Sequence, residues 1–142
     1  MKAYLSRRYR FSASHRLHSD AYSEEKNREI YGKCNNPHGH GHNYLLEITT
    51  SGRIDPTTGM ICDMASLDEA VQKNVIDRFD HANLNHDSSF RDLVPTTENL
   101  CIEIYRRLLP IFAAGEMGGA ELARVRIEET NNNFFEFTGI QG

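Results

Sequence analysis

Two segments in the first third of the chain alternate between polar and apolar residues, as a β-strand does when one of its faces is buried. Residues 3–15 place on one face Tyr9, Phe11, Ala13 and His15. Residues 40–50 place on one face His40, His42, Tyr44, Leu46 and Ile48. Between these predicted strands, residues 18–37 are polar and indicate a long excursion with room for a helical turn.

Two helical patterns follow. The sequence SLDE at residues 66–69 has the capping-box pattern, and apolar residues continue at helical spacing to a predicted end near Phe79. A second helix is predicted to begin at Thr96 or Thr97 after Pro95, and Pro110 is expected to end or kink it.

The last part of the chain again has the pattern of strands. One face of a predicted strand carries Ala123, Val125, Ile127 and Glu129. Three asparagines at 131–133 turn the chain, and residues 134–138 return as a final strand. The order β, β, α, α, β, β predicts an α+β fold in which helices pack on one face of an antiparallel sheet.

Length and composition favour one domain over residues 1–142. With 25% charged residues, no apolar run of the ~20 residues that a membrane span needs and no signal-peptide pattern, we expect a cytoplasmic protein without a membrane partner. A net charge of −4 argues against nucleic acid as a partner. Residues 1–33 are nevertheless locally basic, which fits a solvated edge or a surface that attracts a phosphorylated substrate. The three cysteines do not form a disulfide pattern.

The segment CNNPHGHGH at 34–42 holds three alternating histidines. Antiparallel pairing of the first two strands would bring His15 beside His40 and His42, so that three imidazoles converge. Three histidines with an open fourth position describe a catalytic zinc site, and these three are the expected ligands. His38 also alternates, but it follows Pro37 and precedes the paired region. A flexible turn with exposed histidines is the alternative.

Other candidates surround this end of the predicted sheet. Cys34 suits a base or nucleophile if a nearby cation stabilises its thiolate, but a fourth metal ligand or a buried small residue fits equally well. Asp80 and His81 can hydrogen-bond to each other in a loop, since adjacent helical residues do not face each other. The alternative for this pair is an ordinary helix end and turn. Glu129 closes the third strand near the histidines.

The segment Thr96-Thr97-Glu98-Asn99 first indicates helix capping, and second a set of donors and acceptors for a ligand.

Six strings in this order resemble the 6-pyruvoyl-tetrahydropterin synthase family: FSASHRL (11–17), YGKCNNPHGHGHNY (31–44), IDPTTGM (54–60), DHANL (80–84), PTTEN (95–99) and IEETNNN (127–133). The resemblance implies the tunnelling fold, a four-stranded antiparallel sheet with two helices on one side. It also implies an oligomeric barrel in which trimers stack as homo-hexamers, with active sites between subunits.

The resemblance also implies roles for single residues. The matched zinc ligands are His15, His40 and His42. Cys34 matches the catalytic base, and Asp80 with His81 matches the pair that completes a proton relay. The matched pterin-binding residues are Glu129, Thr96, Thr97 and Glu98. His38 stands where animal members typically carry asparagine, and the basic strand at residues 7–10 matches no motif.

The implied activity is that of a zinc-dependent lyase of tetrahydrobiopterin biosynthesis. Such an enzyme converts 7,8-dihydroneopterin triphosphate to 6-pyruvoyl-tetrahydropterin and eliminates triphosphate. A 6-carboxytetrahydropterin synthase of the queuosine pathway takes the same substrate and also releases acetaldehyde, but the CNNPHGH spacer resembles the pyruvoyl-forming type. A non-catalytic zinc-binding or pterin-binding module is the alternative of another class.

Overall fold

A computed structural model describes residues 2–139 of the chain. Its elements are β1 (Lys2–His15), α1 (Glu24–Tyr31), the 3₁₀ helix η1 (Gly32–Asn35), β2 (His40–Arg53), α2 (Met64–Val71), the π-helix η2 (Gln72–Ile76), α3 (Asp77–Phe79), β3 (Ala82–Asn83), the 3₁₀ helices η3 (Leu84–His86) and η4 (Ser88–Phe90), α4 (Thr97–Ala113), β4 (Glu121–Thr130) and β5 (Asn133–Phe137).

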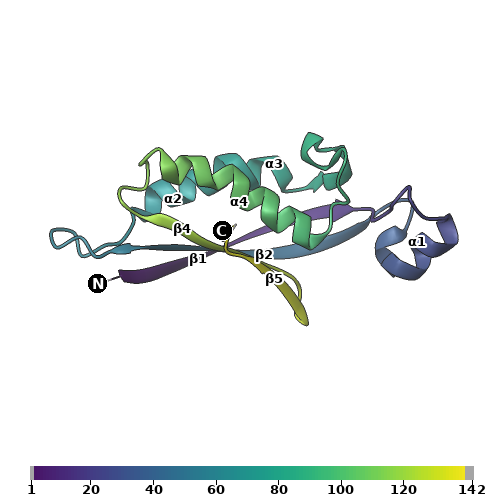
Figure 1. The fold of residues 1–142 in the computed structure, drawn as a ribbon, viewed down its shortest axis with the longest axis horizontal. Coiled ribbons are helices and arrows are strands. Elements are labelled where there is room, and N and C mark those ends of the chain that lie inside the picture. The colour runs from purple at the N-terminus through teal and green to yellow at the C-terminus, as the bar shows by residue number, and fades with distance from the viewer. Residues whose placement is uncertain (1, 140–142) are drawn as a thin grey trace.

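One sheet carries the fold, with the strand order β3-β1-β2-β4-β5. Figure 1 shows α2, α3 and α4 covering one face of this sheet, while α1 lies beyond one end of it. The predicted α+β class is therefore confirmed. The sheet has five strands instead of the expected four, because the two residues of β3 pair in parallel with Ala13 and Ser14 of β1.

The core lies between the sheet and the helices. Ile48 of β2 is fully buried, as are Leu100, Ile104 and Leu108, which form one stripe along α4. These three residues are spaced four apart, which places them on one side of a helix. The apolar faces predicted for β2 and the second helix are therefore the faces that pack.

The pairing of β1 with β2 is antiparallel, as predicted. Its last pair joins His15 to His40, and the preceding pair on the same face joins Ala13 to His42. The polar end of each strand thus meets the polar end of the other, at the end of the sheet beyond which α1 lies.

The predicted start of the first helix was wrong by three residues. Asp63, not Ser66, is the N-cap, and its side chain accepts a hydrogen bond from the Ala65 amide at 3.2 Å. The Ser66 hydroxyl instead donates to Asp63 at 2.8 Å. A carboxylate three residues earlier therefore caps the helix, and a π-helical turn divides it before its predicted end at Phe79.

The second helix begins as predicted, with Thr96 as its N-cap. Pro110 does not end it, because the Ala114 amide donates to the Pro110 carbonyl at 2.9 Å and completes a further turn.

The alternation predicted for β4 breaks at Ala123. Thr49 of β2 pairs with Arg124 and Thr50 pairs with Leu122, which leaves Ala123 as the extra residue of a β-bulge. Leu122 is therefore the buried residue at this end of β4, and Ala123 is only half-buried. Within residues 2–139, the helices are all too short or too polar to span a membrane.

Candidate metal centre and active site

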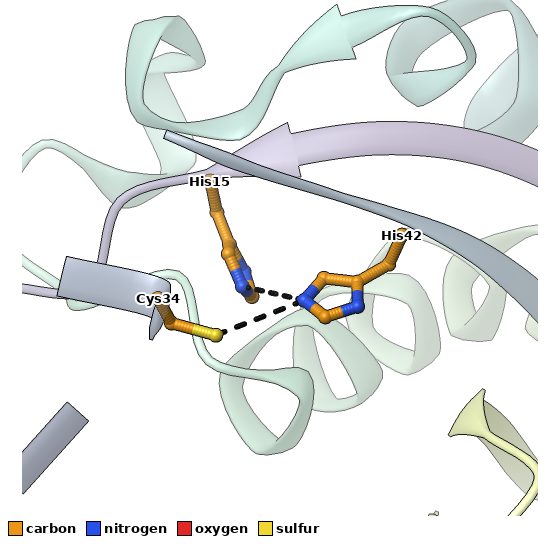
Figure 2. Close-up of side chains that lie close together, drawn as sticks. All are labelled: His15, Cys34 and His42. Atoms are coloured by element: carbon orange, nitrogen blue, oxygen red, sulfur yellow. Dashed lines mark hydrogen bonds between the residues drawn. The ribbon is translucent and has the colours of Figure 1, made fainter. Parts of the chain in front are cut away.

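Three side chains from separate segments converge at the polar end of the sheet (Figure 2). His15 ends β1, His42 lies near the start of β2, and Cys34 lies in η1. The two Nε2 atoms are 3.1 Å apart, and Cys34 Sγ lies 3.8 Å from His42 Nε2. The potential ligand atoms of all three lie within 4.8 Å of one another, a group that could hold a metal ion. We call these three residues the metal-site group.

Cys34 reaches this group because its loop is fastened to the chain that follows β1. The Leu17 amide donates to the Cys34 carbonyl at 2.7 Å. The buried Asn35 side chain donates to the Leu17 carbonyl, also at 2.7 Å. Arg16 Nε adds a bond to the Asn35 carbonyl at 3.2 Å. These bonds hold the thiol beside His15 although the two are 19 positions apart in the sequence.

The orientation of His15 suits a metal ligand. Its Nδ1 lies 2.9 Å from the Pro95 carbonyl, which can only accept a hydrogen bond, so Nδ1 carries the proton. The Nε2 lone pair therefore points toward His42, an arrangement that is common for metal-binding histidines. Two nitrogens bound tetrahedrally to zinc at ~2.0–2.1 Å would lie roughly 3.3 Å apart, close to the spacing of this pair.

Burial also favours the form of these histidines that binds metals. Desolvation lowers the pKa of His15, which is fully buried, and that of His42. Both rings are therefore neutral near pH 7, the state in which imidazole donates a lone pair. The donor set of two neutral imidazoles and a thiol fits zinc.

His40 lies beside the metal-site group but is not part of it. Its ring centroid is 4.7 Å from that of His42, and its backbone pairs with His15. In this geometry Cys34 occupies the place that the sequence analysis gave to a third histidine. The ligand set of His15, His40 and His42 therefore stays a prediction.

Glu129 adds a carboxylate next to the metal-site group. Its Oε1 lies 3.9 Å from His42 Nε2, and the Thr97 hydroxyl donates to its Oε2. The β4–β5 pairing shifts between Glu128 and Thr130, so Glu129 lies in a second irregularity of β4. Such bulges redirect side chains and are common beside active sites.

The other residues of the PTTEN segment face different ways. The Thr96 hydroxyl accepts from the Asn99 amide at 3.2 Å, which is the predicted cap. Glu98 is exposed in the first turn of α4. Thr97 is therefore the member of this segment that the structure places at the candidate site.

Cys34 is not an activated thiol in these surroundings alone. Burial raises its pKa, and the negative charge of Glu129 raises it further. A thiolate at neutral pH would need a compensating positive charge close by.

Asp80 and His81 form the loop contact that the sequence predicted. His81 adopts a left-handed conformation with φ of 58°, and its Nδ1 lies 3.1 Å from Asp80 Oδ1. The Ser12 amide donates to the same carboxylate oxygen at 2.9 Å, a bond that lowers the pKa of Asp80.

This pair lies at the edge of β1 that faces away from β2 and His42. β1 separates β3, which follows His81 directly, from β2, which carries His42. The His81 side chain is 83% exposed. Among residues 2–139, neither hydrogen bonds nor ion pairs join Asp80 or His81 to Cys34 or His42. Within the described part of one chain, these predicted relay residues are therefore not bonded to one another, and the relay stays a prediction.

Tyr44 lies on the same strand face as His42 but is not among the predicted site residues. Its side chain is 1% exposed, and within the described part of the chain its hydroxyl has no hydrogen-bond partner. Burial raises its pKa, and the charges of Glu129 and Cys34 raise it further, so its hydroxyl is neutral. The signal available in the sequence was its position two residues after His42 on the same strand face.

Comparisons with known proteins place the chain in a family. Residues 4–139 match the family model described as 6-pyruvoyl tetrahydropterin synthase. The chain is 42% identical to the 6-pyruvoyl tetrahydrobiopterin synthase of Homo sapiens over 97% of its length and 92% of the relative. It is 32% identical to a putative 6-carboxy-5,6,7,8-tetrahydropterin synthase of Archaeoglobus fulgidus, over 68% of its length and 73% of the relative.

A solved structure extends the likeness to three dimensions. The chain superposes on Caenorhabditis elegans 6-pyruvoyl tetrahydropterin synthase with a TM-score of 0.89 and 39% identity, covering 99% of this chain and 97% of that one.

The fastening of the Cys34 loop can be tested with Asn35→Ala. Removing the side-chain donor leaves the Leu17 carbonyl unpaired, so we expect the free energy of unfolding to fall by about 1–3 kcal/mol. We also expect Cys34 to react faster with iodoacetamide, measured by peptide mass spectrometry, with the buried Cys62 and Cys101 as internal controls. Asn36→Ala, which alters an exposed neighbour, is the matched control. An unchanged alkylation rate in Asn35→Ala would contradict the fastening.

Proposed function

Because the chain belongs to the 6-pyruvoyl tetrahydropterin synthase family, we propose that it is a lyase that converts 7,8-dihydroneopterin triphosphate to 6-pyruvoyl-tetrahydropterin and triphosphate. The observation that carries the proposal is the metal-site group with Glu129 beside it, in a chain that matches such enzymes over nearly its full length. The electrons move within one molecule, from the side chain of the substrate to the pterin ring, so the reaction needs no external redox cofactor.

The second candidate is a 6-carboxytetrahydropterin synthase, which the likeness to the Archaeoglobus fulgidus relative favours. That likeness is lower in identity and spans less of the chain, 68% against 97% for the human relative. We therefore place the pyruvoyl-forming activity first. A non-catalytic binding module would not require a thiol and an Asp–His pair, so it comes last.

We propose that the cofactor is zinc, held by His15, His42 and the adjacent His40. Bound there, the ion would supply Lewis acidity that acidifies a hydroxyl group of the substrate side chain. Its positive charge would also oppose the effects of burial and Glu129 on the pKa of Cys34. Cys34 is then free to act as the base instead of completing the ligand set.

Each remaining residue has a separate task in this proposal. Cys34 removes a proton from a hydroxyl-bearing carbon of the substrate side chain. Glu129, held by Thr97, accepts hydrogen bonds from the amino and ring N–H groups of the pterin and so fixes its register. Asp80 orients His81, which holds or passes the proton. Thr96 and Glu98 belong to the proposed pocket wall, in which Thr96 also caps α4.

The missing link between these residues supports a site shared between subunits. Since Asp80 and His81 form no hydrogen bond or ion pair with Cys34 among residues 2–139, we propose that a second copy supplies the pair, within a homo-hexamer built as a dimer of trimers. We further propose that the enzyme acts in the cytoplasm.

The reaction can be tested by incubating the pure protein with 7,8-dihydroneopterin triphosphate and determining product masses. We expect 6-pyruvoyl-tetrahydropterin together with released triphosphate. Formation of 6-carboxytetrahydropterin and acetaldehyde would instead establish the second candidate. Binding of the substrate without release of triphosphate would contradict both enzymatic proposals.

Cys34→Ala distinguishes a base from a metal ligand. If Cys34 is the base, turnover should fall by about 10²- to 10⁴-fold, because general base catalysis contributes about that much. Bound zinc, measured by atomic spectroscopy on protein freed of loose metal, should stay at one equivalent per chain. Cys62→Ala is the control, since this thiol is buried against Met117. Loss of zinc in Cys34→Ala would assign the thiol to the ligand set.

Mixing two impaired variants tests the shared site. Cys34→Ala and His81→Ala should each retain only a small residual activity alone. When the two are unfolded and refolded together in equal amounts, about a quarter of the sites should combine an intact Cys34 with an intact His81 and regain activity. Refolding each variant separately before mixing is the control. Activity that stays at the residual level after joint refolding, with mixed oligomers verified by mass, would place the whole relay within one chain.

A further inference from the structure

A basic cleft of about 380 Å³ opens beside the metal-site group, between α1 and the start of β2. Its charged lining consists of Arg16, Arg28 and Lys33 with one carboxylate, Glu24. Arg28 and Lys33 are exposed, and neither forms an ion pair within residues 2–139; Glu29, next to Arg28, pairs with Lys26 at 3.7 Å. The cleft therefore presents a net positive charge.

A neighbouring cleft of about 740 Å³ shares Arg16 but has a different charge balance. Its lining includes Arg91 together with the carboxylates of Asp20, Asp87 and Asp92. Asp87 is bound by Arg78 at 2.7 Å, which lies outside this lining. We call it the mixed-charge cleft. An anion would meet three carboxylates there, compared with the single carboxylate of Glu24 in the basic cleft.

The basic cleft continues a row of groups that starts at Glu129. The Glu129 carboxylate lies 3.9 Å from His42 Nε2, the His42 ring lies 4.7 Å from the His40 ring, and His40 lines the basic cleft. The proposed substrate is also a row, with a pterin ring, a three-carbon side chain and a terminal triphosphate. With the pterin at Glu129 and the side chain at the histidines, the third part reaches the basic cleft.

We propose that the basic cleft binds the triphosphate of the substrate, with Arg28 and Lys33 as its charge contacts. This inference rests on the proposed function for the identity of the ligand. Guanidinium and ammonium groups are the side chains that bind phosphate oxygens most strongly. Contacts to the triphosphate would hold the leaving group at one end while Glu129 holds the pterin at the other.

The test compares two ligands that differ only in the triphosphate, 7,8-dihydroneopterin triphosphate and 7,8-dihydroneopterin. Affinities are measured by calorimetry on the full-length, zinc-loaded His81→Ala protein, which should turn over only slowly and whose substitution lies outside the metal-site group. We expect Arg28→Gln with Lys33→Gln to weaken binding of the triphosphate ligand about tenfold, because exposed charge contacts are individually modest. Binding of 7,8-dihydroneopterin should not change.

Arg91→Gln is the matched control, because it removes an exposed arginine from the mixed-charge cleft. Three results would each overturn the inference. The first is equal affinity of the His81→Ala protein for the two ligands, and the second is a loss of triphosphate-ligand affinity in Arg91→Gln as large as in the double variant. The third is an equal loss of affinity for both ligands in the double variant. Failure of the proposed function would be seen in a separate assay, in which the unsubstituted protein forms no product. The affinities for 7,8-dihydroneopterin triphosphate and 7,8-dihydroneopterin would still test whether the cleft binds triphosphate.

Discussion

The antiparallel register between β1 and β2 is the constraint on which both core and site depend. The ladder runs without interruption from the pair Lys2 and Arg53 to the pair His15 and His40. A slip of one residue would turn every side chain of one strand to the opposite face. Tyr44 would then leave the core, and His42 would leave His15. The register that buries the apolar residues is thus the register that assembles the metal-site group.

The face of the sheet without helices helps to fix that register. Glu47 of β2 is buried there, with Arg8 of β1 at 3.2 Å, and on the β4 side Arg124 at 2.7 Å and Arg126 at 3.7 Å. A buried carboxylate that lost such partners would be strongly destabilising, so the alignment that supplies all three is favoured. This contact gives part of the basic strand at residues 7–10 a structural role.

Strand alternation predicted the convergence of His15 and His42, because burying the apolar face of both strands restricts how β1 can align with β2. It could not predict the bulges at Ala123 and Glu129, which depend on how β4 meets both neighbours. Neither could it place Cys34, whose position depends on hydrogen bonds from Asn35 and Leu17 across a long excursion. Local sequence patterns predict helices and strands. The hydrogen bonds that hold Cys34 in the site join segments far apart in the sequence, so a local pattern does not reveal them.

The two edge strands of the sheet, β1 with its short partner β3 and β5, offer backbone groups with which a second copy of the chain could pair. β1 spans 14 residues, yet on its outer side it pairs with β3 only at Ala13 and Ser14 among the described residues. The other edge is β5, a strand of five residues. Strands with unpaired backbone groups can pair with another chain, and closure into a ring leaves no edge exposed. Because the Ser12 amide of β1 donates to Asp80, a neighbouring chain that paired along the outer edge of β1 would lie close to Asp80 and His81. The same strand would then set both the ligand geometry and the approach of the partner.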